Sequence, residues 1–379
     1  MDLTIISTFR CNSRCQMCYI WKNPTEPKEE VSIETLSKLP GGFDNLNVSG
    51  GEPTLRRDLA EIVEELYPKA RILEISSNGL NPERLVPIIK RHPNIKVRFS
   101  LEGDAATSNA IRGEKDGYQI KLKGIRMLRE AGGTDLGFAM VIQDENADQL
   151  VNVYELARSE GIELATSTLH NAWQFYKNDN YFYNRAKTAK EVEGLITAML
   201  KTNKVKNWFR AYLNLGLIEK ILGHDRLIPC TAGSDFAFVD PWSDVWACNV
   251  RSDLPLGNLA RQDWSEIMNS EQARSSLGKV RACTQNCWMV TTARTAMRSR
   301  LVPQLPKLSP MAWVIYNKLK VTVGGKVDFA SYIDYDKVLE TPLVPRTSNL
   351  GRSVKAEIKV QRGLATTEEH YPLAEFINR

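Results

Sequence analysis

The first 170 residues alternate between short apolar runs and helical patterns, and this alternation constrains the fold more than any other feature of the chain. The apolar runs predict strands at 3–8, 44–49, 71–76, 95–101, 135–142 and 162–168. Helical patterns lie between them, at 32–39, 56–67, 82–91, 118–131 and 146–160. Six such units predict an α/β fold with a parallel sheet curled into a complete or partial barrel. In barrels of this kind the active site lies at the carboxyl ends of the strands.

The clearest helical pattern is 118–131, which ends at Gly132-Gly133 as a helix C-terminus prefers. Its apolar residues are expected to form a stripe that faces the core. This stripe consists of Ile120, Leu122, Ile125, Met127 and Leu128.

Three cysteines, Cys11, Cys15 and Cys18, lie on the loop that follows the first predicted strand. Thiolates this close together suit a soft iron–sulfur site, for which cysteine is the usual ligand. Three ligands are one short of a closed [4Fe–4S] site, so one iron would stay open to a small molecule. A zinc knuckle and chance spacing are the alternatives.

Glycine and polar residues follow the next strands, at the same predicted edge of the sheet. The motifs are Ser49-Gly50-Gly51-Glu52-Pro53, Ser76-Ser77-Asn78-Gly79, Ser100-Leu101-Glu102-Gly103 and Ile111-Arg112-Gly113. Glycine pairs let the backbone approach a ligand closely, and an arginine can clamp a carboxylate. Singly, each motif is also compatible with an ordinary turn or a solvated side chain.

Together with the cysteine triplet, these motifs resemble the radical S-adenosylmethionine (radical SAM) superfamily, over roughly residues 1–170. The resemblance implies a partial (β/α)6 TIM-like barrel. It also implies a [4Fe–4S] cluster on the three cysteines, with SAM on the open iron. Two departures are Glu102, where related sequences often have Asp, and Ser108, where they often have His.

The resemblance also assigns roles to the cofactor-binding residues. Glu52, with the Gly50–Gly51 backbone and the adjoining Pro53, would bind the methionyl amine. Arg112 would bind the methionyl carboxylate. The ribose and nearby polar groups would be met by Ser77, Asn78, Ser100 and Glu102.

The other four cysteines are Cys230, Cys248, Cys283 and Cys287. Two of them flank a predicted hairpin, in which 235–239 and 244–248 are the strands. Four separated cysteines suit a structural zinc site. The segment, however, resembles the twitch form of the SPASM domain, which implies an auxiliary [4Fe–4S] cluster held by all four. The two sets use all seven cysteines, so no thiol is left to quench a substrate radical.

His170 follows the sixth strand, where a substrate would lie, and could act as a catalytic base. A hydrogen-bonded structural histidine is the alternative. Beyond the hairpin, residues 294–326 contain seven basic and no acidic residues. This segment predicts contact with an anionic partner, such as a membrane surface or an anionic substrate, or else a solvated helix face. Nothing in the chain resembles a nucleic-acid-binding module.

No signal sequence or membrane span is evident in the chain, so we expect a cytoplasmic protein, with peripheral membrane contact through 294–326. The predicted domains are a barrel at 1–203, a helical linker at 204–229, the twitch domain at 230–290 and a basic helical extension at 291–379.

The function expected from these features is a radical SAM oxidoreductase. It would abstract a hydrogen atom from a carbohydrate, cyclitol or glycan precursor and pass an electron to the auxiliary cluster. An external donor such as flavodoxin or ferredoxin would reduce the SAM cluster. The alternative is a peptide maturase, although such enzymes commonly carry a leader-binding domain and only ten residues precede Cys11. A non-catalytic iron–sulfur or zinc protein is the least favoured hypothesis.

Overall fold

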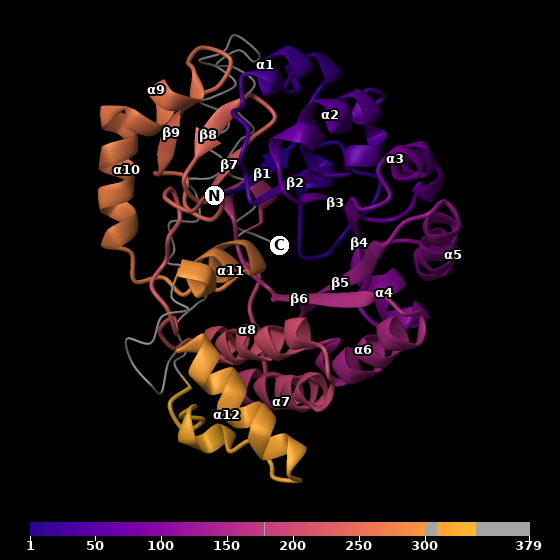
Figure 1. The fold of residues 1–379 in the computed structure, drawn as a ribbon, viewed down its shortest axis with the longest axis vertical. Helices are drawn as coiled ribbons and strands as arrows, with labels where there is room; N and C mark the ends of the chain where they lie inside the picture. Colours follow the sequence, from indigo (N-terminus) through magenta and orange to yellow (C-terminus); the bar gives the residue numbers. More distant parts are fainter. Residues whose placement is uncertain (178, 300–308, 339–379) are drawn as a thin grey trace, which may run out of the picture.

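The computed structural model describes residues 1–177, 179–299 and 309–338, and its strands form one nine-stranded sheet (Figure 1). The strand order is β6-β5-β4-β3-β2-β1-β7-β8-β9. The first six strands are parallel: β1 Asp2–Ile6, β2 Asn45–Ser49, β3 Leu73–Ser77, β4 Lys96–Ser100, β5 Asp135–Ile142 and β6 Glu163–Thr168. All six lie within two residues of the predicted strands, so the parallel sheet is confirmed.

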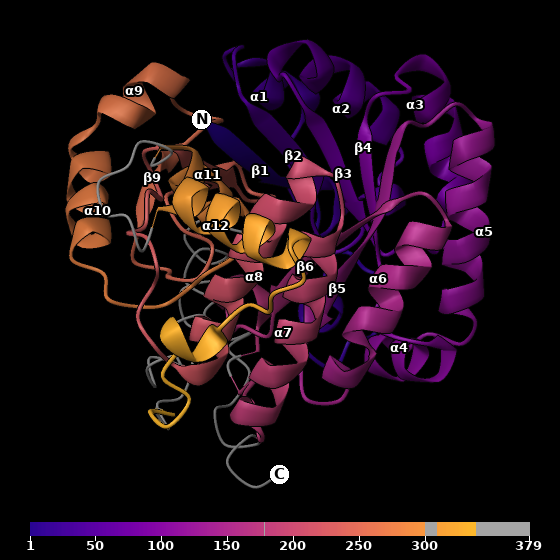
Figure 2. The ribbon, with the colours of Figure 1, turned by 60° about the horizontal axis from the view of Figure 1, so that its bottom comes forward.

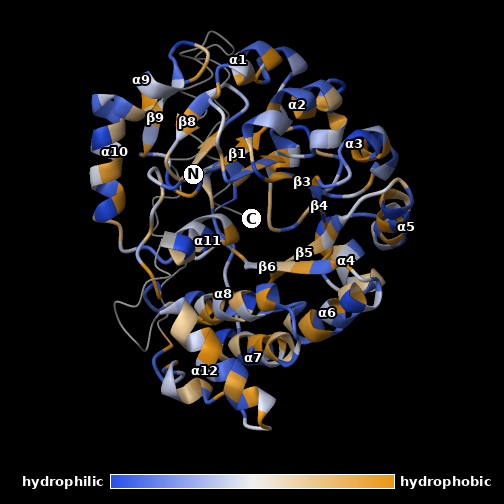
Figure 3. Ribbon diagram, viewed as in Figure 1, coloured by the Kyte–Doolittle hydropathy of each residue, from blue (hydrophilic) through white to orange (hydrophobic). Residues whose placement is uncertain are grey.

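Helices cover the outside of these strands, as Figure 2 shows. The first six are α1 Ile33–Ser37, α2 Leu59–Leu66, α3 Val86–Arg91, α4 Ala105–Arg112, α5 Gly117–Glu130 and α6 Leu150–Ser159. Short 3-10 helices are η1 Ile20–Lys22, η2 Pro27–Glu29, η3 Pro53–Leu55, η4 Tyr67–Lys69, η5 Pro82–Leu85, η6 Ala147–Gln149, η7 Trp173–Phe175 and η8 Phe329–Ser331. In Figure 3 most helices carry both hydrophobic and hydrophilic residues, as expected for helices with one face on a core. The fold is therefore the expected partial TIM-like barrel.

Two helical predictions need correction. Helix α4 was not predicted, because it is mostly polar; its N-terminus is capped by Asp104, whose carboxylate accepts a hydrogen bond from the Thr107 amide at 2.8 Å. In α5 the predicted stripe is correct only in part. Ile125 and Leu128 are fully buried as expected, but Met127 is 37% exposed, and Lys121 is fully buried on the core face. The core face of α5 therefore carries a cation.

Helices α7 (Arg185–Lys201) and α8 (Val205–Leu222) pack against each other and against the barrel. Their apolar residues are almost entirely buried, including Leu195, Met199 and Ile218. The segment 204–229, predicted as a helical linker, is helical over α8 and contributes Ile218 to the core.

The sheet continues from the barrel into the predicted twitch domain. Strand β7 (Phe236–Val239) pairs in parallel with β1, and β8 (Asp244–Trp246) and β9 (Pro255–Asn258) follow antiparallel. The predicted hairpin is β7–β8. Helices α9 (Trp264–Asn269) and α10 (Glu271–Arg281) cover this end of the molecule. The two predicted domains therefore share one sheet.

The basic segment is only partly a free surface. On α11 (Val290–Ser299), Arg294 and Arg298 both bind the carboxylate of Asp2, at 2.7 and 2.5 Å. On α12 (Pro310–Thr322), Lys318 donates to two backbone carbonyls at the end of α7. Arg300, Lys307 and the tail 339–379 lie outside the described residues. No helix in the described part of the chain is long and apolar enough to cross a membrane.

Candidate functional site

The cysteine triplet lines a cavity of about 190 Å³ at the carboxyl end of the sheet. Its lining residues come from the carboxyl ends of the six parallel strands and the loops that follow them. Ten predicted site residues meet there: Cys11, Cys15, Cys18, Gly50, Gly51, Ser77, Asn78, Ser100, Arg112 and His170. Three others, Glu52, Pro53 and Glu102, lie behind the cavity wall and are buried.

Gly50 and Gly51 lie directly against the chain that leads into the cysteine loop. The Gly51 amide donates to the Thr8 carbonyl at 2.7 Å, and the Glu52 amide donates to Arg10 at the same distance. A Cβ atom on Gly51 would lie 2.3 Å from the Arg10 carbonyl oxygen, and one on Gly50 would lie 2.5 Å from that of Thr8. Only glycine therefore fits this approach.

Glu52 is fully buried, and both of its carboxylate oxygens already accept hydrogen bonds. Thr54 donates through its amide and hydroxyl at 2.9 and 2.7 Å, and the Ser77 hydroxyl donates at 2.9 Å. The Asn78 amide donates at 2.6 Å. Burial raises the pKa of Glu52, while these hydrogen bonds oppose the rise. The carboxylate thus fixes the backbone of the Ser77–Asn78 turn at the cavity wall.

Arg112 reaches the cavity between two buried carboxylates. Its Nη1 donates to Glu102 at 2.9 Å and its Nε donates to Glu114 at 3.0 Å. Burial alone would lower the pKa of Arg112, but nearby Cys15 and the two glutamates outweigh it and raise the pKa. Glu102 also accepts the Val141 amide at 2.7 Å, so it orients the arginine and joins β4 to β5.

The end of α4 holds the cysteine loop in place. The amides of Arg14 and Gln16 donate to the carbonyls of Arg112 and Ile111, both at 2.9 Å. Gly113 has a φ of +61°, and a Cβ atom there would lie 2.8 Å from the Arg14 carbonyl oxygen. The Ile111-Arg112-Gly113 motif is therefore a backbone support for the loop.

Glu114 connects this support to the core. Its carboxylate accepts the Ser13 hydroxyl at 2.6 Å and also binds Arg112 and Lys121. Burial lowers the pKa of Lys121 to about 8, and the charge of Arg112 adds to the fall, while Glu114 opposes it. Ser13 lies between two predicted cluster ligands, so this network fixes the loop from beneath.

His170 lies at the cavity edge with one ring nitrogen engaged. Its Nδ1 lies 3.3 Å from the Thr168 carbonyl, while its Nε2 is shielded from solvent and has no hydrogen-bond partner among the described residues. Burial lowers the pKa of His170 to about 3, and the charge of Lys220 adds to the fall. The imidazole is therefore neutral at physiological pH.

The second cysteine set lies around Cys248, which follows β8. Burial is the main cause that raises the pKa of Cys248 to about 11, and the charges of Cys230 and Cys283 add to the rise. Burial also raises the pKa of Cys287, and the charges of Cys248 and Cys283 add to this rise. The four cysteines therefore belong to one neighbourhood of the fold, and their role as ligands of one cluster stays a prediction.

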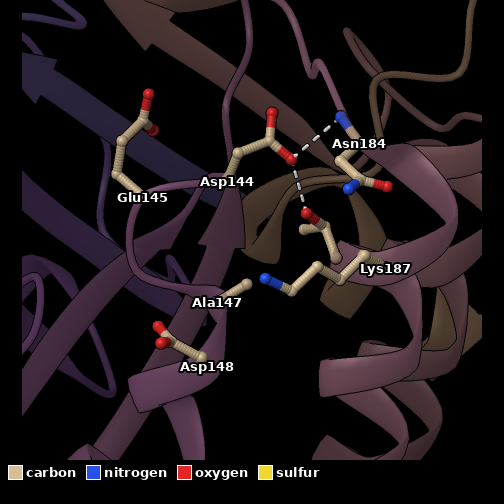
Figure 4. A pocket seen from close by; sticks show the side chains of 7 residues that line it. Asp144, Glu145, Ala147, Asp148, Asn184 and Lys187 are labelled. Carbon is tan, nitrogen blue, oxygen red and sulfur yellow. Dashed lines mark hydrogen bonds between the residues drawn. The ribbon is translucent and has the colours of Figure 1, made fainter.

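A second cavity, of about 250 Å³, lies between the loop after β5 and the start of α7 (Figure 4). Asp144 lines this cavity and lies at the start of α7. Its carboxylate accepts hydrogen bonds from the Asn184 amide at 3.3 Å and from the Thr188 hydroxyl at 2.6 Å. None of the predicted site residues lines it. We therefore assign it a structural role in starting α7.

The donor chemistry of both cysteine sets fits iron–sulfur clusters. All seven cysteines are free thiols rather than disulfides. Among the described residues, no three Cys, His, Asp or Glu side chains converge on a position for one ion, which a mononuclear zinc site would require. A [4Fe–4S] cluster binds each thiolate through a different iron and needs no such convergence.

Comparison with known proteins agrees with this chemistry. Residues 5–157 match the radical SAM superfamily, and residues 230–288 match SPASM, an iron–sulfur cluster-binding domain. The pre-heme d1 synthase of Dinoroseobacter shibae is 30% identical over 292 residues, which cover 69% of this chain and 71% of that protein. The mycofactocin maturase MftC of Mycolicibacterium smegmatis is 25% identical over 301 residues, 74% of each chain.

A solved structure, native anSMEcpe with bound AdoMet (SAM) and Cp18Cys peptide, has a TM-score of 0.58 and 14% identity, covering 85% of this chain and 97% of that one. This likeness shows that the fold is shared. With the sequence matches above, it means that the chain belongs to the radical SAM superfamily. It is a radical SAM enzyme with a SPASM domain, and these two domains imply [4Fe–4S] clusters and SAM as cofactors.

Sequence reasoning missed four charged residues near the two sites: Glu114, Lys121, Lys220 and Arg226. The position of Glu114 directly after Gly113 was a usable signal. Lys121 could have been found as the one cation on the buried face of α5. For Lys220 and Arg226 no local pattern indicates that their side-chain nitrogen atoms are buried, because this burial depends on tertiary packing.

Proposed function

We propose that this chain reductively cleaves SAM and abstracts a hydrogen atom from a peptide substrate. The observation that carries the proposal is the single cavity that brings Cys11, Cys15 and Cys18 together with Gly50–Gly51 and Arg112. When bound, the cluster and SAM supply a 5′-deoxyadenosyl radical, which is the hydrogen-abstracting agent.

The chain's own residues bind and orient these groups. Cys11, Cys15 and Cys18 would hold the first cluster. The Nη2 nitrogen of Arg112 makes no hydrogen bond to the described residues. This nitrogen would donate to the methionyl carboxylate.

The backbone at Gly50–Gly51 would meet the methionyl amine, and Ser77, Asn78 and Ser100 would meet the ribose and its neighbours. From the sequence we expected contact with SAM, or support of that contact, from Glu52, Pro53 and Glu102. We propose instead that these buried residues hold the backbone of the cavity wall, because both carboxylates already accept hydrogen bonds. His170, whose Nε2 has no partner among the described residues, would accept a hydrogen bond from the substrate; its pKa of about 3 makes it too weak a base to take a proton.

The similar proteins support a peptide substrate better than the carbohydrate or cyclitol substrate expected from the sequence. MftC is named a maturase, and the anSMEcpe structure holds a peptide together with AdoMet on this fold. A second candidate substrate is a tetrapyrrole precursor, because the relative with 30% identity is a pre-heme d1 synthase. In each case Cys230, Cys248, Cys283 and Cys287 would hold the auxiliary cluster, and an external flavodoxin or ferredoxin would supply the reducing electron.

The test is anaerobic SAM cleavage by the reconstituted protein with a reductant. We expect 5′-deoxyadenosine to form, and Cys15→Ala to abolish it, while Cys248→Ala retains cleavage but loses substrate oxidation. Iron should total about eight per chain for two [4Fe–4S] clusters. Candidate peptides and tetrapyrrole precursors are added in separate reactions. Only one of these two substrate classes should raise the rate of SAM cleavage. Absence of cleavage by fully loaded protein with every class overturns the proposal.

A peripheral membrane contact is proposed for α12. Its inner face packs Trp313 and Val314 into the core. On its outer face Ile315 and Leu319 are 51% and 61% exposed, and Val323, just after the helix, is 82% exposed. Exposed apolar side chains at helical spacing beside lysines, with no acidic residue at 309–327, suit an anionic bilayer surface.

A further inference from the structure

Two cations near the second cysteine set have buried side-chain nitrogen atoms without an acceptor among the described residues. Lys220, in the last turn of α8, is 2% exposed, and its Nζ has no hydrogen-bond partner among the described residues. Arg226 follows in the next loop; its Nε donates to the Ile228 carbonyl at 3.1 Å, but its buried Nη1 and Nη2 donate to none of the described residues. A buried unpaired cation is costly, so both groups need a negative partner.

The carboxylate next to Lys220 in the sequence does not serve as this partner. Glu219 adjoins Lys220 in sequence, but its side chain binds His224, with 2.5 Å between carboxylate oxygen and Nδ1. The segment that carries the predicted cluster ligand Cys287 lies beside this end of α8, because the side-chain amide of Asn286 donates to the His224 carbonyl at 2.8 Å.

Arg226 lies against the residue that follows Cys287. Its guanidinium lies 5.2 Å from the ring centre of Trp288, the residue after Cys287. Both cations therefore lie beside the segment that carries a predicted ligand of the auxiliary cluster.

Helix α8 is locked to the segment that carries Cys287. The Trp288 ring packs on Gly216, where a Cβ atom would lie 2.2 Å from the indole. The indole nitrogen also donates to the Leu213 carbonyl at 2.8 Å. Lys220 lies four residues after Gly216, one helical turn further along the same side of α8. Its distance from the second cysteine set is therefore fixed by packing rather than by a flexible loop.

We propose that Lys220 and Arg226 are the counter-charges of the auxiliary cluster and raise its reduction potential. A [4Fe–4S] cluster with four thiolates is anionic, and it gains one more negative charge when it takes up one electron; no bond forms or breaks. Nearby cations in a buried site stabilise the reduced form more than the oxidised form. The inference rests on the cluster and is independent of which substrate the enzyme uses.

The experiment is a redox titration of the reconstituted full-length chain, followed by electron paramagnetic resonance. Spectra are recorded with and without SAM, and the signal that SAM leaves unchanged is assigned to the auxiliary cluster. Lys220→Met and Arg226→Met should each make reduction harder by about tenfold in the ratio of reduced to oxidised cluster, which for one electron is a 59 mV negative shift. Lys220→Arg, which keeps the charge, should match the wild type.

The matched control is Lys206→Met, on the same helix. Lys206 is 50% exposed and pairs with Glu163 at 2.7 Å, so its loss should leave the potential unchanged. If the Lys220→Met variant does not load the auxiliary cluster, the potential is measured in Arg226→Met instead. An unchanged potential of the auxiliary cluster in that variant overturns the proposal. Unchanged potentials with weakened substrate binding also overturn it and assign the cations to the substrate.

Discussion

Ser13 and Glu114 are 101 residues apart in the sequence, yet the hydroxyl of one donates to the carboxylate of the other at 2.6 Å. The same carboxylate binds Arg112 and the buried Lys121. One glutamate thus joins the cysteine loop, the end of α4 and the core face of α5.

Replacement of Glu114 by Gln should destabilise the protein by about 3–5 kcal/mol, because it leaves the ammonium of Lys121 buried without its partner. Iron loading of the first cluster should fall as well. Chemical denaturation and iron analysis measure the two effects. The control is Glu155→Gln, which removes an exposed pair with Arg158 and should cost about 0.5 kcal/mol or less. Equal effects in the two variants would argue against the network.

A second substitution tests whether the charge is the cause. Lys121→Met in the Glu114→Gln background removes the orphaned cation, so part of the lost stability should return. A further fall of the same size as the first would indicate that packing of the lysine stem, rather than its charge, dominates.

Substitution of Gly51 by Ala should cost about 1–3 kcal/mol and weaken SAM binding, because the new methyl group collides with the Arg10 carbonyl. Gly278→Ala is the matched control. Gly278 lies in α10 with open space around its Cα, so alanine there should stabilise by about 0.5–1 kcal/mol. Thermal unfolding and equilibrium SAM binding separate the two sites, and a neutral Gly51→Ala would refute the close approach.

Acid should destabilise the protein through His170. Its folded pKa of about 3 lies below the usual value of 6.5, so the unfolded chain binds a proton first as the pH falls. The stability is complete above pH 6.5 and is lost progressively between pH 6.5 and 3. From pH 7 to 5 this one group should remove about 2 kcal/mol. In His170→Asn the pH dependence should be flatter by that amount, and unfolding curves at both pH values provide the check.

Vesicle sedimentation tests the contact proposed for α12. The triple variant Ile315→Ser, Leu319→Ser, Val323→Ser should lower binding to vesicles that contain anionic lipid, since it removes the exposed apolar side chains. Tyr183→Ser, which removes an exposed aromatic ring from another surface, should bind as the wild type does. Wild-type protein that remains in the supernatant with both neutral and anionic vesicles would exclude the contact.

The sequence predicts the six barrel strands well because each is a short apolar run with helical residues on both sides. It also places the cysteine triplet and Arg112 correctly at one edge, since parallel strands end on the same side. Helix α4 escapes prediction because it has no apolar stripe and depends on Asp104 as its cap. Burial of Lys121 and Lys220 follows from tertiary packing, which overrides the usual exposure of lysine.

The pairing of β1 with β7 was also beyond local patterns, because it joins segments more than 200 residues apart. It has a consequence for how the chain is made. During synthesis β1 emerges first, and one of its edges stays unpaired until residues 236–239 have left the ribosome. An open edge next to a cysteine-rich loop invites association with other chains. A fragment cut at the predicted barrel boundary, residue 203, would keep that edge open permanently, so the barrel should be expressed together with its β7–β9 partner strands.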